Sequence, residues 1–267
     1  MKCDAREQLP IFTAEADQLA LLARSKSVRV PEVYGVGSDR DYSFLLLEYQ
    51  QLKPLDAHGA YCLGQQLAHL HQWSEQPQFG LDFDSDLTTT PQPNAWQRRW
   101  SEFFAEQRIG WQLQLAAEKG MTFGDIDDIV DRVYLRLQHH QPQPSLLHGN
   151  LWPGNCAMTA HGPILFDPAS YWGDRECDLA MLPLYPELPP QIYDGYQSVW
   201  PLGGRVYRAP AALSAVLSAQ PQQPVRRPAS GGGTTRGGGA VAAGGVITFR
   251  GAERRPVDGS GRAGQLP

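Results

Sequence analysis

Two groups of polar side chains near the middle of the chain could do chemistry. The first lies in the stretch LLHGNLWPGN and contains His148, Asn150 and Asn155. The second is Asp167, in the stretch ILFDPA. Each group follows a short apolar run, so we expect both to lie at strand ends, where Gly149 eases the backbone into a loop. Acidic and amide side chains at strand ends are more typical of a functional site than of a hydrophobic core.

The residue types point to one reaction class. Phosphoryl transfer requires oxygen ligands for a hard cation and a group that holds the attacking hydroxyl, and this segment contains both. Spacing alone also allows a polar hairpin with no chemistry.

The motifs LLHGNLWPGN and FDPASYWGDRECDLAM, in this order, resemble the catalytic core of the fructosamine kinase (ketosamine-3-kinase) family. That family belongs to the protein-kinase-like group, which includes aminoglycoside phosphotransferases. The resemblance runs from residue 1 to about residue 199, through AEADQLALL, YSFLLLEY, GQQLAHLHQ and QFGLDFD. It implies an α+β, protein-kinase-like fold of two lobes, with an incomplete small N-terminal lobe and a mostly helical C-terminal lobe.

The same resemblance implies a reaction. The γ-phosphoryl group of ATP would pass to a sugar hydroxyl of a ketosamine, which is either a small molecule or a protein-bound adduct. Asp167 would hold Mg²⁺ on the phosphates, Asn155 would add a neutral oxygen ligand, and His148 would brace the loop. The residue that should accept the proton of the incoming hydroxyl is Asn150.

The nucleotide would be held by residues of the N-terminal lobe. By resemblance, Lys2 on a strand pairs with Glu15 on the next helix and holds the α- and β-phosphates. Glu48 and Tyr49 occupy the hinge between the lobes, where backbone groups would meet the adenine. Without the resemblance to this family, the sequence would favour a solvated Lys2 near the N-terminus and an exposed Glu15 on a helix.

Three departures from the family pattern predict a poor or inactive kinase. The family motif reads HGD where this chain has Asn150, and an amide cannot act as a general base. No glycine-rich phosphate loop precedes Lys2, so we expect a truncated N-terminal lobe. No family-like helices follow residue 200. The alternatives are an inactive kinase-fold binding protein and a kinase for another small hydroxyl substrate, such as an aminoglycoside or choline.

The chain divides into three regions: a partial N-terminal lobe (1–50), a helical lobe with the catalytic loop (51–200), and a Gly/Arg-rich tail (201–267). The tail has nine Arg, no Lys and two acids, so it carries +7 and the preceding residues −12. Its composition predicts disorder. A translated wrong reading frame of GC-rich DNA would look like this; the alternative is a natural tail that binds nucleic acid weakly.

Composition narrows the class of protein further. Hydrophobic residues make up 42% and charged residues 19%, as in globular proteins, and a net charge of −5 gives no reason to expect nucleic acid as a partner. The four cysteines form no C-x-x-C pair, which favours a reduced, cytoplasmic protein. No apolar run is long enough to span a membrane.

Apolar periodicity predicts the elements that must position these residues. Thr13 is a plausible N-cap for one helix, and Asn94 for a long aromatic-rich helix that ends near Lys119. His69 and His71 point to different sides of their helix, so no metal pair is expected there. The predicted helices span residues 13–26, 57–73, 94–119, 125–139, 176–182 and 191–199, and the predicted strands span 33–36, 44–49, 146–147 and 164–166.

Overall fold

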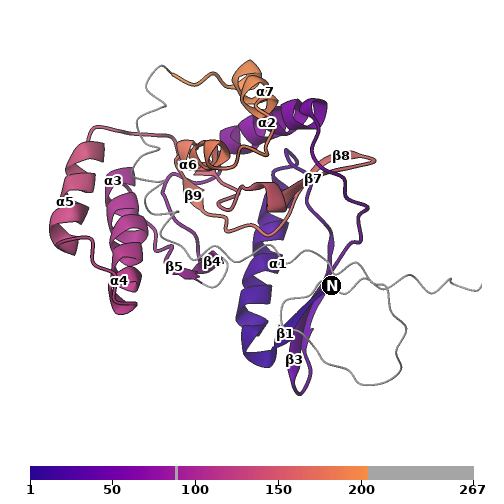
Figure 1. The fold of residues 1–267 in the computed structure, drawn as a ribbon, viewed down its shortest axis with the longest axis horizontal. Helices are drawn as coiled ribbons and strands as arrows, with labels where there is room; N and C mark the ends of the chain where they lie inside the picture. Colours follow the sequence, from indigo (N-terminus) through magenta and orange to yellow (C-terminus); the bar gives the residue numbers. More distant parts are fainter. Residues whose placement is uncertain (88–89, 204–267) are drawn as a thin grey trace, which may run out of the picture.

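The computed structural model describes residues 1–87 and 90–203. Its N-terminal part is a three-stranded antiparallel sheet in the order β1-β3-β2, formed by β1 (Lys2–Ala5), β2 (Val33–Ser38) and β3 (Tyr42–Leu47). One helix, α1 (Leu9–Arg24), packs beside this sheet (Figure 1). The lobe therefore places Lys2 on an edge strand facing a helix.

Alternation along β3 explains how this sheet is built. Ser43 and Leu45 are buried, whereas the residues that alternate with them, Tyr42, Phe44 and Leu46, are exposed. This period of two is that of a strand with one covered face. Lys2 pairs in register with Leu45, so the position of β3 in the core also fixes β1.

The larger part of the molecule is mostly helical, with short two-stranded pairs among and beside its helices (Figure 1). The pairs are β4 (Ser85–Leu87) with β5 (Thr90–Gln92), β6 (Ser145–Leu146) with β9 (Trp172–Gly173), and β7 (Cys156–Thr159) with β8 (Gly162–Leu165). The helices are α2 (Ala57–Gln72), α3 (Trp100–Phe104), α4 (Trp111–Glu118), α5 (Ile126–Leu137), α6 (Glu176–Met181) and α7 (Gln191–Val199).

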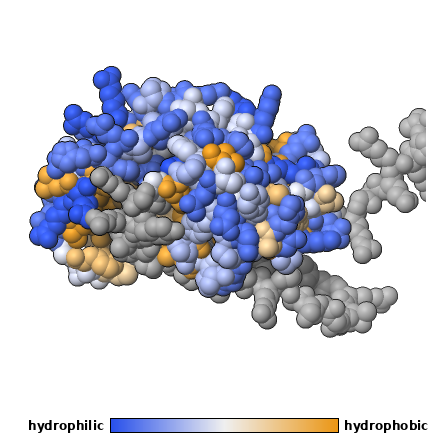
Figure 2. All heavy atoms as spheres, turned by 90° about the horizontal axis from the view of Figure 1, so that it is seen from above, coloured by the Kyte–Doolittle hydropathy of each residue, from blue (hydrophilic) through white to orange (hydrophobic). Residues whose placement is uncertain are grey.

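The core lies between these helices and pairs. Leu63, Leu67 and Leu70 of α2 are fully buried, so the predicted apolar face of this helix is confirmed. The aromatic side chains of Trp100, Phe103 and Phe104 are also buried and belong to this core. The face seen over α2 and α7 is predominantly hydrophilic, with small separate hydrophobic areas (Figure 2). Among the described residues, no helix is both long and apolar enough to cross a membrane.

Two predicted helix starts are wrong. Helix α1 begins at Leu9, and the Thr13 hydroxyl donates to the Leu9 carbonyl inside the helix rather than capping it. Pro10 accounts for the earlier start, because proline is well suited to the first turn. The long helix begins at Trp100 and not at Asn94, whose side chain is used by a buried polar cluster instead. It also contains a π-helical segment, η2 (Ala105–Gly110), between α3 and α4.

The predicted tail lies almost entirely outside the described residues, which end at residue 203. The proposed boundary between lobes near residue 50 falls in the stretch between β3 and α2 and stays a prediction.

Helices α2 and α7 cross at a point where two glycines allow close approach of the backbones. A Cβ at Gly64 would overlap the Ile192 carbonyl oxygen, and one at Gly195 would overlap the Tyr61 carbonyl oxygen. Packing at this distance leaves no room for a methyl group. The crossing matters for the site because α2 carries His71 and α7 carries Tyr196.

We expect Gly64→Ala to destabilise the protein by about 1 kcal/mol, since overpacking costs about 2 kcal/mol and the gain in helix propensity offsets only about 1 kcal/mol of it. Urea unfolding would measure this. Gly35→Ala is the control, because a Cβ at Gly35 meets open space. If the Gly64→Ala variant proved as stable as the unaltered protein, the close crossing would be contradicted.

Candidate active site

The turn after β6 is held by one buried carboxylate. Asp178, at the start of α6, accepts hydrogen bonds from the backbone N–H groups of His148 (2.7 Å) and Gly149 (2.8 Å). Gly149 has a φ of 77°, and a Cβ there would overlap the Ala169 carbonyl. Only glycine fits this turn without strain. The acid therefore fixes the backbone from which Asn150 projects.

A helix behind the turn supplies a third donor. The His71 Nε2–H donates to Asp178 Oδ2 at 3.2 Å, and His71 Nδ1 is hydrogen-bonded to the Tyr196 hydroxyl at 2.9 Å. All three side chains are buried. Burial alone would raise the pKa of Asp178, but these donors outweigh it and the pKa lies below its usual value. Sequence reasoning rejected a metal role for His71 but did not foresee this structural one.

His148 is fully buried inside the same turn. Its Nδ1 accepts the backbone N–H of Asn150 at 3.3 Å. Burial lowers the pKa of His148, so the ring is neutral at pH 7 and can accept this bond. The geometry is that of a brace, not of a reacting group.

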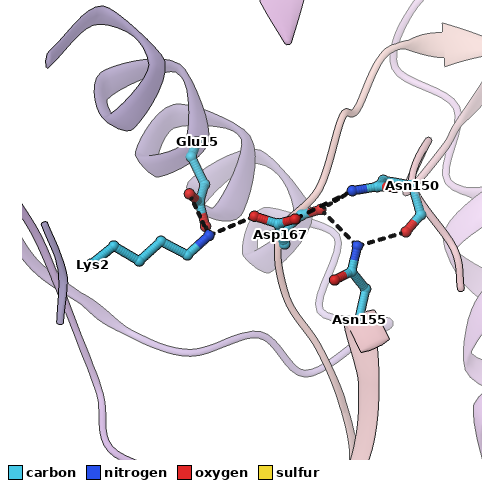
Figure 3. Close-up of polar contacts among 5 residues, drawn as sticks. All are labelled: Lys2, Glu15, Asn150, Asn155 and Asp167. Atoms are coloured by element: carbon cyan, nitrogen blue, oxygen red, sulfur yellow. Dashed lines mark hydrogen bonds and ion pairs between the residues drawn. The ribbon is translucent and has the colours of Figure 1, made fainter. Parts of the chain in front are cut away.

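Two amides hold Asp167 in place, as Figure 3 shows. Asp167 follows β8 with a φ of 57°, a left-handed conformation that is uncommon for residues other than glycine. Its carbonyl oxygen accepts from Asn150 Nδ2 at 2.9 Å and from Asn155 Nδ2 at 3.3 Å. Asn155 also donates to the Asn150 carbonyl at 2.9 Å. The two predicted groups are therefore a single hydrogen-bonded cluster.

Lys2 joins this cluster from the other lobe. Its Nζ donates to both Glu15 oxygens, at 2.7 and 2.8 Å, and to Asp167 Oδ1 at 2.5 Å (Figure 3). Burial disfavours the ammonium, yet the two carboxylates outweigh it and raise the pKa of Lys2. Burial raises the pKa of Glu15, and the negative charge of Asp167 adds to this effect, so that together they outweigh the opposing influence of the Lys2 ammonium. The predicted Lys–Glu pair is present.

A cavity of about 40 Å³ opens beside the cluster. Glu15 and Gln18 of α1 line it on one side, and Asn150 and Asp167 on the other. Asp86 of β4 completes the wall. Sequence reasoning missed Asp86 and Gln18, because both lie far along the chain from the motifs. Gln18 Oε1 accepts the Ser170 N–H at 2.6 Å and so ties α1 to the segment after Asp167.

The two predicted hinge residues lie apart from this cluster. Glu48 follows β3, where its N–H donates to the Glu32 carbonyl at 2.8 Å and its carboxylate lies 3.9 Å from Arg29 Nη2. Tyr49 is largely exposed, at 72%. No hydrogen bond or ion pair in the described part of the chain joins either residue to the cluster.

Comparison with known proteins identifies the family. A family model described as fructosamine kinase matches residues 1–209. The chain belongs to the fructosamine kinase family. It is 77% identical over 202 residues to a protein of Klebsiella aerogenes named a probable ketoamine kinase, an alignment that covers 76% of this chain and 71% of that protein. A probable ketoamine kinase of Escherichia coli strain K12 is 73% identical over 202 residues, with the same coverage.

Solved structures confirm the predicted protein-kinase-like fold. A crystal structure from Haemophilus somnus, assigned as a fructosamine-3-kinase, is similar with a TM-score of 0.73 and 43% identity, covering 81% of this chain and 72% of that one. An aminoglycoside-3'-phosphotransferase of type VIII has a TM-score of 0.50 at 19% identity, covering 82% and 83%. At that identity the second likeness concerns the fold alone. The family and the structural likeness together show that this member of the fructosamine kinase family is an α+β protein with a protein-kinase-like fold.

We expect Asp178→Asn to destabilise the protein by about 3 kcal/mol. The side-chain NH₂ group of asparagine would face the N–H groups that now donate to the carboxylate, and a donor cannot bond a donor. Urea unfolding would measure the loss, and faster hydrogen exchange at the amides of residues 148 and 149 would locate it. Asp131→Asn, on the exposed face of α5, is the matched control.

The pH dependence has a defined sign. The folded-state pKa of Asp178 is lowered, so its stabilisation is complete above the ordinary aspartate pKa and is lost progressively as the pH falls from there through the lowered value. The difference in stability between the unaltered protein and Asp178→Asn should therefore shrink only in strong acid. A difference that vanishes near pH 6 would contradict this.

Proposed function

We propose that this chain binds ATP and a ketosamine, and transfers the γ-phosphoryl group to a sugar hydroxyl at a reduced rate. The observation that carries the proposal is the cluster in which Lys2 and Glu15 meet Asp167 beside a cavity that Asn150 also lines. A cation aimed by a fixed carboxylate, next to a second carboxylate, is the arrangement that nucleotide phosphates require.

Lys2 would hold the phosphates. Two of its three hydrogens are committed to Glu15, which fixes the direction of the ammonium. The third now bonds Asp167, and a phosphate oxygen would take that place. Glu48 and Tyr49 would then lie towards the adenine end, as the family resemblance implies.

The residues present fit a magnesium ion. Mg²⁺ prefers oxygen ligands and is commonly held by one or two carboxylates plus substrate phosphates. Asp167 offers a carboxylate that is 44% exposed, and the Asn155 amide oxygen is turned away from Asn150 (Figure 3). The described residues contain no cluster of three His, Cys, Asp or Glu that could hold a metal, so the phosphates and water would complete the shell. When bound, the ion would neutralise charge on the phosphates.

Asn150 is the reason for a reduced rate. Its Nδ2 donates to the Asp167 carbonyl, and its amide oxygen can orient a hydroxyl but cannot take its proton. Loss of a general base costs about 10²–10⁴-fold. The second candidate function, non-catalytic binding of a nucleotide or a glycated ligand, is favoured by this same residue.

The substrate is proposed from the names of the relatives, which are ketoamine kinases. A free or a protein-bound ketosamine would satisfy the chemistry equally. The cytoplasmic location stays a prediction from the cysteine spacing.

We expect Asn150→Asp to raise turnover of a simple fructosamine by about 10²-fold, the lower end of the effect of a general base. Coupled ADP formation together with mass analysis of the phosphorylated sugar would measure it. Asn150→Ala is the control and should not exceed the unaltered chain. Robust turnover by the unaltered chain would refute impairment, and absence of product from all three would favour the binding function.

We expect Asp167→Asn to abolish the magnesium-dependent part of nucleotide binding, because the substitution removes the charged oxygen ligand. The measurement is the thermal shift produced by ATP with Mg²⁺ and by ATP with a chelator. Asp131→Asn should keep the full shift of the unaltered protein. If Mg²⁺ still adds to the ATP-induced thermal shift of the Asp167→Asn variant as it does for the unaltered protein, the metal assignment is wrong.

A further inference from the structure

One wall of the active-site cavity comes from a hairpin that the family motifs do not include. Ser85 and Leu87 of β4 are buried, and Asp86 between them points to the opposite side of the strand, into the cavity. Asn150 and Asp167 line the same cavity. A ligand placed for reaction at Asn150 would therefore meet the Asp86 carboxylate.

A buried polar cluster holds this short strand in place. Asn94 Nδ2 donates to Ser85 Oγ at 3.0 Å and to the Phe83 carbonyl at 3.1 Å. Arg108 Nη2 in turn donates to Asn94 Oδ1 at 2.6 Å. The Arg108 guanidinium also lies over the Tyr171 ring, 4.1 Å from its centroid. The cluster therefore ties β4, and with it the backbone of Asp86, to the aromatic core.

The Asp86 carboxylate has no cation of its own. Within the described residues it makes no ion pair and accepts no hydrogen bond, whereas Glu15 and Asp167 share Lys2. Burial and the nearby Asp84 raise the pKa of Asp86, which means that its charge is poorly compensated. A cationic group that enters the cavity would compensate the negative charge of Asp86.

We propose that Asp86 determines substrate specificity by binding the protonated amine of the ketosamine. The inference rests on the proposed function. A ketosamine carries its amine on the first sugar carbon, and the name of the Haemophilus relative places phosphorylation at the third. Amine and reacting hydroxyl are thus only a few bonds apart, so the group that binds the amine must line the cavity that Asn150 lines. Asp86 meets that condition.

The test compares a cationic and a neutral ligand that differ in one non-hydrogen atom. The probes are 1-deoxy-1-propylamino-fructose and 1-O-propyl-fructose, titrated calorimetrically into the full chain with Mg²⁺ and a non-hydrolysable ATP analogue. Asp86→Asn should weaken the amine about 10-fold or more, as expected for loss of a charge-assisted hydrogen bond, and leave the ether within about twofold. Asp86→Glu should recover part of the amine affinity, and Asp131→Asn should change neither.

The outcomes separate the inference from the proposed function. Equal weakening of both ligands would show that Asp86 only shapes the cavity, and unchanged amine affinity would show that it does not bind the amine; either result overturns the inference while the kinase assignment stands. If the unaltered chain neither binds nor phosphorylates either sugar, the proposed function fails and the inference fails with it.

Discussion

The buried carboxylate of Asp178 accepts three hydrogen bonds, from the His148 and Gly149 backbone and from the His71 ring. An uncompensated charge at this depth would be very unfavourable, so the three donors must stay together for the protein to remain folded. The interaction joins α2, α6 and the turn after β6. Packing of α2 against α7, where Tyr196 bonds His71, therefore helps to set the position of Asn150.

Charge balance shapes the cavity in a similar way. Glu15, Asp86 and Asp167 line it, and Lys2 is the cation that two of them share. Such a site favours cationic ligands, because each one offsets a carboxylate that protein groups leave incompletely paired. A magnesium ion at Asp167 and the protonated amine that we propose at Asp86 would each meet this requirement.

Asn150 shows how stability and catalysis can oppose each other. Its Nδ2 donates to the Asp167 carbonyl, a bond that a carboxylate cannot make, and Asp167 carries its own negative charge nearby. The amide therefore stabilises the arrangement seen here, while the proton acceptor that the family motif provides is absent. The same side chain explains both the order of the cluster and the reduced rate that we propose.

Much of the fold followed from the sequence because it depends on local periodicity. The apolar face of α2, the bounds of α7, and the motifs that carry His148 and Asp167 were all predictable. The start of the helix at Trp100 was not, because Asn94 looks like a cap and is instead bound by Arg108 and Ser85. The family, and the two motifs that together form the hydrogen-bonded cluster, were thus determined by the sequence. Only the tertiary structure decided that Lys2 reaches Asp167 and that Asp86 lines the cavity with Asn150, since such contacts depend on packing between segments that no local pattern encodes.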